Sequence, residues 1–322
     1  MHFMLEEIKS EPAIVKTFKS RKFPDLEETI ESLEDSEIIY TVGNGTSHNA
    51  AIYLSILLNR KGLNCIPIFS SETGKWLSKE GTKSTSIVFS QSGESTDIIE
   101  SVNYLKKLGS KIIGVTNEKN SRLDKLSDLR LFTEAGREIS VAATKSHITQ
   151  LLVSLKIYFY DREVEFLKIL EEITSNLILV EQNDKSIKEI GKSKMLDTVF
   201  LGSGLLYPIA LEASLKLMET SNVISYAFPT REFLHGPRQL IDENWSVFML
   251  SSDPKVKSEV ESLKGKLVEI PDFMKVQYGM SSNNEFIDSI LYLFFGQLVS
   301  YYTSIGRGLN PDSPSKLRKI VK

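Results

Sequence analysis

The sequence predicts an α/β protein made of two tandem three-layer αβα subdomains, each built on a parallel sheet. Three observations lead to this prediction. Short β-branched or apolar runs alternate with segments of helical period. Small-residue loops separate the two kinds of segment, and one part of the chain resembles another about 160 residues later. The 322 residues are enough for two domains of ordinary size.

In the first half, short apolar runs are expected to form strands, and the segments of helical period between them are expected to form helices. An alternation of this kind indicates parallel strands joined by crossover helices. The expected strands are residues 38–42, 65–69, 86–89, 111–115 and 129–132. The expected helices are residues 47–59, 95–107 and 141–158.

Two matches within the chain indicate an internal duplication. A shift of 159 residues places Gly43 on Gly202 and Gly45 on Gly204. A shift of 160 residues places residues 86–92 on 246–252. Because both matches occur at nearly the same offset, we interpret the second half as a copy of the first. The copies differ after the second match, where only the first half continues into a longer polar loop.

Composition excludes several classes of protein. A formal net charge of −3 gives no electrostatic case for binding nucleic acid. The single cysteine, Cys65, excludes a disulfide framework and a multi-cysteine metal site, and the four histidines lack metal-ligand spacing. There is no signal-peptide core and no apolar run of about 18 residues. We therefore expect a cytoplasmic protein that binds no metal, membrane or nucleic acid.

The polar loop of the first half, residues 90–96, is a candidate phosphate site. It follows an expected strand and begins an expected helix, where unpaired N–H groups and the helix dipole stabilise an anion. Gly93 permits close approach of the backbone or a positive φ. The alternative is that Ser95 only caps the helix and the other polar residues only form a turn. A second small polar loop, residues 45–47, favours the ligand site.

A dinucleotide site is a weaker interpretation of the same region. Gly43 and Gly45 could begin a G-x-G-x-x-G motif, but His48 occupies the place of the third glycine. Glu72, the acidic candidate for a ribose hydroxyl, lies further along the chain than the usual spacing of about 20 residues. A P-loop is excluded because its motif does not occur.

The second half contains the residues best suited to proton transfer. Glu212, Lys216 and Glu219 are spaced by four and three residues, so that they share one face of an expected helix. On a solvated face they would be ordinary ion pairs. The leucines between them indicate burial, which favours a proton-transfer group. His235 precedes Gly-Pro and is expected on a loop, where it either takes part in function or fixes the turn.

The basic tail contains turn-forming residues at 310–314. Most basic tails are solvated. Asn-Pro-Asp and Ser-Pro sequences at these positions instead suggest a specified path, which could bring a lysine to a site.

Five motifs in order carry a resemblance to a known family: residues 45–47, 90–95, 135–145, 210–219 and 232–237. Together they resemble the double sugar-isomerase (SIS) domain, and in particular the isomerase half of glucosamine-6-phosphate synthase. The resemblance spans nearly the whole chain and implies flavodoxin-like subdomains.

The resemblance also implies the ligand-binding residues of this sequence. Those expected to hold the sugar phosphate are Thr46, Ser47, Ser90, Gln91, Ser92 and Ser95. Those expected to line the sugar are Val141 and Ala143.

The catalytic residues are implied in the same way. Glu219 would move the proton between C1 and C2, with support from Lys216 and Glu212. His235, often supplied in the family by a neighbouring subunit, would assist ring opening. Lys319 matches the tail lysine that forms a Schiff base with the ketose carbonyl. The implied assembly is a homodimer with a shared active site, and no cofactor is implied.

Some positions depart from the synthase pattern. Ala143 stands in place of a serine, Ser95 in place of a threonine, Met218 in place of a lysine and Arg137 in place of a small polar residue. The glutaminase domain of the synthase has no counterpart in these 322 residues, so we expect no glutamine hydrolysis by this chain.

The expected function is interconversion of glucosamine 6-phosphate with fructose 6-phosphate and ammonia. The alternatives are a deglycase acting on a 6-phosphorylated sugar–amine adduct, a non-catalytic sugar-phosphate sensor, and a domain partnered with a separate glutaminase. The ligand in each case is a phosphorylated amino sugar or ketose, or an adduct of one.

The expected organisation has five parts. They are an N-terminal helical segment (1–36), a phosphate-binding subdomain (37–160), a connecting helix (161–192), a second subdomain (193–306) and a tail that closes the active site (307–322).

Overall fold

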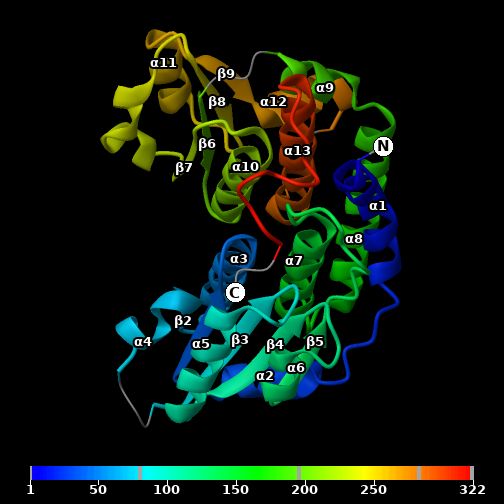
Figure 1. The fold of residues 1–322 in the computed structure, drawn as a ribbon, viewed down its shortest axis with the longest axis vertical. Helices are drawn as coiled ribbons and strands as arrows, with labels where there is room; N and C mark the ends of the chain where they lie inside the picture. The colour runs from blue at the N-terminus through cyan, green and yellow to red at the C-terminus, as the bar shows by residue number, and fades with distance from the viewer. Residues whose placement is uncertain (1, 79–81, 194–196, 281–283, 320–322) are drawn as a thin grey trace. The chain divides into compact units, whose positions relative to one another are not determined.

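The structure is a computed structural model, and it describes residues 2–78, 82–193, 197–280 and 284–319. Contacts between residues divide the chain into two compact units, each containing one sheet (Figure 1). The five-stranded unit contains Ala13–Glu138, Lys145–Leu170 and residues 318–319. The four-stranded unit contains residues 2–12, Ile139–Thr144 and Glu171–Leu317.

The five-stranded unit has a fully parallel sheet with the strand order β2-β1-β3-β4-β5. Its strands are β1 (Ile38–Gly43), β2 (Cys65–Phe69), β3 (Ser84–Ser90), β4 (Lys111–Thr116) and β5 (Leu129–Phe132). Its helices are α2 (Leu26–Glu34), α3 (Thr46–Arg60), α4 (Thr73–Trp76), α5 (Thr96–Lys107), α6 (Arg122–Leu126) and α7 (Lys145–Tyr158), with a 3₁₀ turn η1 (Ser70–Glu72).

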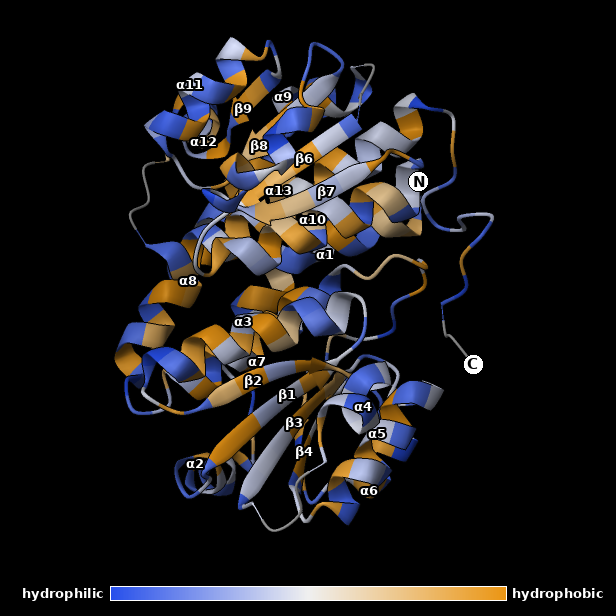
Figure 2. Ribbon diagram, turned by 90° about the vertical axis from the view of Figure 1, so that its left-hand side faces the viewer, coloured by the Kyte–Doolittle hydropathy of each residue, from blue (hydrophilic) through white to orange (hydrophobic). Residues whose placement is uncertain are grey.

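Helix α5 illustrates how sequence periodicity produces this layer. Its buried apolar residues, Ile98, Val102 and Leu105, recur every three or four positions and pack against β3 and β4 in one core cluster. Figure 2 shows both hydrophobic and hydrophilic residues along α5 and α6, as expected for helices that cover one face of a sheet.

The strands and helices predicted in this half are confirmed, with one correction. Strands β2 and β5 have the expected bounds, and β3 extends two residues earlier and one later than predicted. The helix expected at residues 141–158 begins only at Lys145. In a helix from residue 141, the N–H of Ser146 would donate to the carbonyl oxygen of Ala142. It donates instead to Glu138 Oε1 (3.1 Å), and the Ala142 carbonyl oxygen accepts from Ser140 Oγ (2.8 Å).

The four-stranded unit repeats this architecture with the strand order β7-β6-β8-β9, again fully parallel. Its strands are β6 (Asp197–Gly202), β7 (Ser225–Pro229), β8 (Trp245–Met249) and β9 (Lys266–Glu269). Its helices are α9 (Lys185–Lys192), α10 (Leu206–Ser221), α11 (Pro254–Ser262), α12 (Ile270–Tyr278) and α13 (Glu285–Gly306), with 3₁₀ turns η2 (Glu232–His235) and η3 (Pro237–Leu240).

Helices α1 (Phe3–Phe18) and α8 (Glu163–Gln182) each contribute residues to both units. The segment 161–192, expected to be one connecting helix, contains two helices, α8 and α9.

Helix α13 is buried along almost its whole length and packs on α10, where a Cβ added at Gly296 would lie 2.9 Å from that of Ala213. Only a glycine allows the two helices to approach this closely.

The internal duplication is visible in the backbone. Strands β1 to β4 occupy the same sheet positions as β6, β7, β8 and β9. A Cβ on Gly43 or on Gly202 would come within 2.5 Å of the first turn of the following helix. Gly45 and Gly204 both have positive φ, +51° and +57°. The two halves thus make the same strand-to-helix turn with the same pair of glycines.

Candidate functional site

The polar loop between β3 and α5 lies at the carboxyl end of a central strand. β3 is buried at every position and pairs with β1 on one side and β4 on the other. The N–H of Gly93 donates to Ser90 Oγ (3.0 Å), and the N–H of Glu94 donates to Ser92 Oγ (3.3 Å). The carbonyl oxygen of Gln91 accepts from the N–H of Asn117 (3.1 Å). The path of the loop is therefore fixed by its own hydroxyls and by the end of β4.

Gly93 is required by this geometry for two reasons. Its φ is +64°, a conformation that L side chains rarely adopt. A Cβ there would lie 2.3 Å from Ser121 Oγ. The loop is thus pressed against the beginning of α6, as expected from the sequence for a position of close backbone approach.

The N-terminus of α5 differs from that of its counterpart in the other unit. At α11, the Asp253 carboxylate caps the helix by accepting from the N–H groups of Lys255 (3.0 Å) and Val256 (3.2 Å). At α5, Ser95 occupies the N-cap position but makes no side-chain cap bond. The four-stranded unit thus fills this place with its own carboxylate, whereas the five-stranded unit leaves a helix N-terminus suited to an external anion.

An ion pair completes the capped arrangement in the four-stranded unit. Arg231 Nε donates to Asp253 Oδ2 (2.7 Å), and this hydrogen bond holds the pKa of the Asp253 carboxyl below its usual range. The capping group is therefore a stable anion, and α11 is not available to a second one.

The second polar loop, residues 45–47, lies at the end of β1, directly beside β3 in the sheet. Ser47 Oγ accepts a hydrogen bond from Nε2 of Gln150 on α7 (3.0 Å). Because the amide donates, the Ser47 hydrogen can point toward a ligand. Thr46 and Ser47 begin α3, so the structure brings both predicted phosphate-binding loops to one edge of one sheet.

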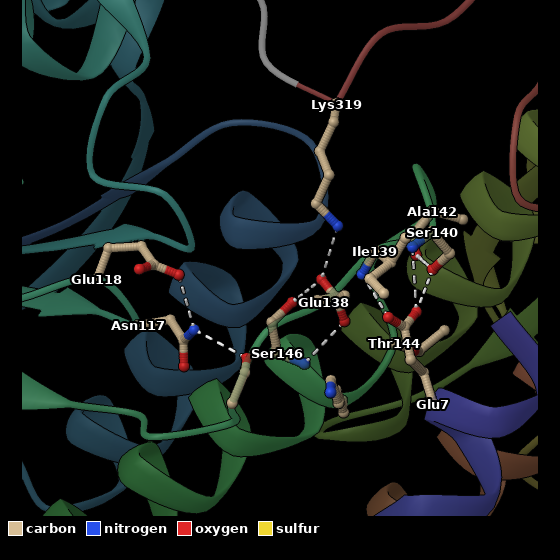
Figure 3. A network of polar contacts seen from close by, with 12 residues as sticks. Glu7, Asn117, Glu118, Glu138, Ile139, Ser140, Ala142, Thr144, Ser146 and Lys319 are labelled. Carbon is tan, nitrogen blue, oxygen red and sulfur yellow. Dashed lines mark hydrogen bonds and ion pairs between the residues drawn. The ribbon is translucent and has the colours of Figure 1, made fainter. Parts of the chain in front are cut away.

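A pocket of about 430 Å³ adjoins the polar loop within the five-stranded unit. Gln91 and Ser92 form part of its wall, together with the loop after β4. Glu138 and Lys319 also line it, with Lys319 Nζ 3.6 Å from Glu138 Oε2. Glu138 in turn accepts from the N–H (3.1 Å) and Oγ (2.7 Å) of Ser146 at the start of α7, as Figure 3 shows. A buried carboxylate thus faces the tail lysine beside the candidate phosphate loop.

Helix α10 gathers the three predicted proton-transfer residues. Lys216 Nζ lies 3.2 Å from Glu212 Oε1 and 2.5 Å from Glu219 Oε2. The side chains of Glu212 and Lys216 are 0 % and 1 % exposed, whereas that of Glu219 is 24 % exposed. Of the three, Glu219 is therefore the one that a ligand can reach from solvent.

The protonation state of Lys216 follows from its contacts. Burial alone would lower the pKa of Lys216, but the charges of Glu212 and Glu219 outweigh burial and raise that pKa overall. Lys216 is consequently a permanent ammonium at neutral pH. Its hydrogen bond to Glu219 holds the carboxyl group of Glu219 in place.

His235 also belongs to the four-stranded unit. It ends the 3₁₀ turn η2, where the sequence predicted a loop, and its side chain is exposed. Phe233 of the same turn is fully buried in the core of the unit and anchors it. Val141 and Ala143 lie in the non-helical segment before α7, and both are half-buried.

Sequence reasoning did not assign roles to Gln150 and Glu138. Gln150 is buried on α7, and a buried amide is a signal that the side chain has a specific partner. Glu138 stands within the motif at residues 135–145, but local spacing does not reveal that it faces Lys319.

The described residues contain no group of three or more His, Cys, Asp or Glu arranged to hold a metal ion. No helix in the described ranges is both long and apolar enough to cross a bilayer.

Comparison with known proteins places these features in a family. The SIS domain matches residues 32–156 and 193–269. Glutamine–fructose-6-phosphate aminotransferase (isomerizing) of Sulfolobus acidocaldarius is 32 % identical over 99 % of this chain and 56 % of its own length. The same-named protein of Thermotoga maritima is 32 % identical over 99 % of this chain and 58 % of its own length. The chain thus spans little more than half the length of these relatives.

Two solved structures have a similar fold over nearly the whole chain. The C-terminal domain of glucosamine-fructose-6-phosphate aminotransferase from Francisella tularensis has a TM-score of 0.84 and 28 % identity, covering 97 % of this chain and 98 % of that one. Glucosamine-6-phosphate deaminase from Thermotoga maritima has a TM-score of 0.82 and 26 % identity, covering 99 % of both chains. With its two parallel sheets and matching turns, the chain belongs to the SIS domain family.

Proposed function

We propose that this chain is an aldose–ketose isomerase-type enzyme that interconverts glucosamine 6-phosphate and water with fructose 6-phosphate and ammonia. The observation that supports this most directly is the ionic group on α10, in which the partly exposed Glu219 is held by the buried Lys216. The names of the relatives and of the solved structures point to the same substrates.

In this proposal the sugar phosphate is bound by the edge of the five-stranded sheet. The uncapped N-terminus of α5 offers N–H donors and its dipole, and the hydroxyls of Ser92, Ser95 and Ser47 add further donors. All of these donors stabilise the phosphate dianion, so the proposal requires no buried cation beside the phosphate. The Asp253 carboxylate at the N-terminus of α11 shows the same kind of contact, in which helix N–H groups bind an anion.

Glu219 is proposed as the group that transfers the proton between C2 and C1. As a carboxylate it removes the proton from C2 of the open-chain amino aldose, and it then returns the proton to C1. The product is an imine at C2, which water hydrolyses to the ketose and ammonia. Lys216 holds the carboxyl group of Glu219 in position, and Glu212 compensates the buried charge of Lys216. His235 is proposed to assist ring opening.

Lys319 is proposed to form an imine with the ketose carbonyl in the reverse direction. Its amine attacks C2 of fructose 6-phosphate with loss of water, and ammonia then displaces the lysine. Before attack the ammonium must lose a proton, and Glu138, 3.6 Å away, is the neighbouring carboxylate able to accept it.

The direct test is incubation of the purified chain with glucosamine 6-phosphate, followed by assay of ammonia and fructose 6-phosphate. We expect turnover by the wild type and a loss of about 10²–10⁴-fold in kcat for Glu219→Gln. Glu243→Gln, which changes an exposed carboxylate of the same unit, is the matched control and should leave kcat unchanged. Absence of turnover by the wild type in both directions would reject the proposal.

A second candidate is a deglycase that acts on a 6-phosphorylated sugar–amine adduct. The pocket beside the polar loop favours it, because its volume of about 430 Å³ leaves room for a substituent on the amine and Arg137 lines it. Comparison of kcat/KM for glucosamine 6-phosphate with that for N-substituted analogues decides between the two. A preference for the adducts would identify the deglycase.

A further inference from the structure

Glu7 of α1 holds a segment that lies more than a hundred residues away in the sequence. The Glu7 side chain is buried, and its two oxygens face donors of residues 139 and 140. Oε1 accepts from the N–H of Ile139, and Oε2 accepts from the N–H of Ser140 (3.3 Å) and lies 2.5 Å from its Oγ. Figure 3 shows Glu7 pointing from α1 to both residues. Every one of these contacts requires an acceptor, which a carboxylate supplies and an amide supplies only in part.

Asp312 of the C-terminal tail holds the other end of the same arrangement. Its carboxylate caps α1, with Oδ2 accepting from the N–H of Phe3 (2.9 Å) and Oδ1 from that of Met4 (2.8 Å). Its carbonyl oxygen accepts from the N–H of Val141 (3.2 Å). Its own N–H donates to Asn310 Oδ1 (3.0 Å), which closes a turn at the Asn-Pro-Asp sequence. The tail therefore follows a specified path as far as this residue.

Three consecutive N–H groups, those of residues 139, 140 and 141, are thus all bound by α1 and the tail. A helix that began at residue 141 would offer these groups no acceptor of its own, because the first N–H groups of a helix have no intrahelical partner. The acceptors on α1 and the tail therefore satisfy the N–H groups of a non-helical segment that precedes α7, which begins at Lys145. All of the residues in these contacts belong to the four-stranded unit: Phe3, Met4, Glu7, Ile139, Ser140, Val141 and Asp312.

We infer that Glu7 and Asp312 are positioning residues that fix the substrate-lining segment and the start of the tail together. The segment contains Val141 and Ala143, and the tail continues to Lys319 seven residues after Asp312. The consequence for catalysis rests on the proposed function, in which these residues contact the sugar. The effect of Glu7 and Asp312 on backbone order is independent of the proposed function.

The test is Glu7→Gln, measured by hydrogen exchange and by kinetics. Loss of a charge-assisted acceptor should speed exchange of the amides of residues 139–141 by about tenfold or more. Exchange in α13 should stay as in the wild type. The KM for glucosamine 6-phosphate should rise by a similar factor, while kcat changes less. Glu6→Gln, an exposed carboxylate one residue away on α1, is the control and should change none of these quantities.

The outcomes separate this inference from the proposed function. If the wild type has no turnover, the proposed function fails, and hydrogen exchange alone still decides whether Glu7 orders the segment. Unchanged exchange at residues 139–141, or equal acceleration throughout the unit, would overturn the positioning role. Faster local exchange with unchanged KM in an active enzyme would overturn its link to substrate. If Glu7→Gln does not fold, Asp312→Ala with Ser313→Ala as control gives the same readouts.

Discussion

Removal of the buried ammonium of Lys216 gives a stability test with a defined pH dependence. In Lys216→Met, the carboxylate of Glu212 keeps its 0 % exposure but loses the cation 3.2 Å away. Removing one partner of a buried ion pair costs about 3–5 kcal/mol. Glu219 contributes less to this cost, because its 24 % exposure leaves it partly solvated.

The sign of the pH dependence follows from the charge left behind. A buried carboxylate without its cation prefers the protonated form, so that its pKa in the folded variant rises above the unfolded value. The folded variant then binds more protons than the unfolded chain, and its stability falls as pH rises, by at most about 1.4 kcal/mol per pH unit. The wild type lacks this slope near neutral pH, because the raised pKa of Lys216 matters only in strongly alkaline solution.

The assay is urea unfolding of Lys216→Met and of the wild type at pH 5, 7 and 8. We expect the deficit of the variant to be largest at pH 8 and clearly smaller at pH 5. Glu212→Gln combined with Lys216→Met removes both charges, so it should recover more than half of the deficit and abolish the pH dependence. A deficit below about 1 kcal/mol that does not change with pH would show that the pair is not the buried ionic group described above.

Two further predictions concern buried polar residues of the five-stranded unit. His48 is buried and stacks on Phe69 with ring centroids 3.5 Å apart, and burial lowers its pKa to about 4. Only the unfolded chain then takes up a proton between about pH 6.5 and 4, so stability should fall by about 3 kcal/mol over this range, and His48→Gln should lose this part of the slope in urea unfolding. Gln150→Glu should weaken fructose 6-phosphate binding about tenfold in calorimetry, because the new carboxylate accepts from Ser47 and turns its hydrogen away from the ligand. The control Gln182→Glu adds the same charge at an exposed position; equal affinities of both variants would contradict this role of Gln150.

Local sequence patterns were sufficient for the elements that depend on local periodicity. The strands β2 and β5 have the predicted bounds, and α3 and α5 agree with prediction to within one residue at each end. The duplication was readable because both halves need the same glycine pair for the same turn. The spacing of Glu212, Lys216 and Glu219 also predicted one helix face, and the structure shows the three side chains in contact.

Features that depend on pairing between distant residues could not be predicted in this way. Gln150 and Ser47 are 103 residues apart, and Glu7 and Ser140 are 133 apart. No periodicity relates such pairs. The error at the start of α7 has a different origin: the local pattern of residues 141–144 fits a helix, but the N–H of Ser146 donates to Glu138 Oε1 and not to the carbonyl oxygen of Ala142.

These distant pairs have a common consequence for how the site is built. The sequence motifs supply groups suited to contact a ligand, such as Ser47, whereas a partner outside the motifs decides how this hydroxyl is oriented. Gln150, which lies outside all five motifs, determines which way the Ser47 hydroxyl donates. A relative that keeps the motifs but changes Gln150 would therefore retain the fold and the apparent site, and would differ in the orientation of the Ser47 hydroxyl on which the proposed phosphate binding depends.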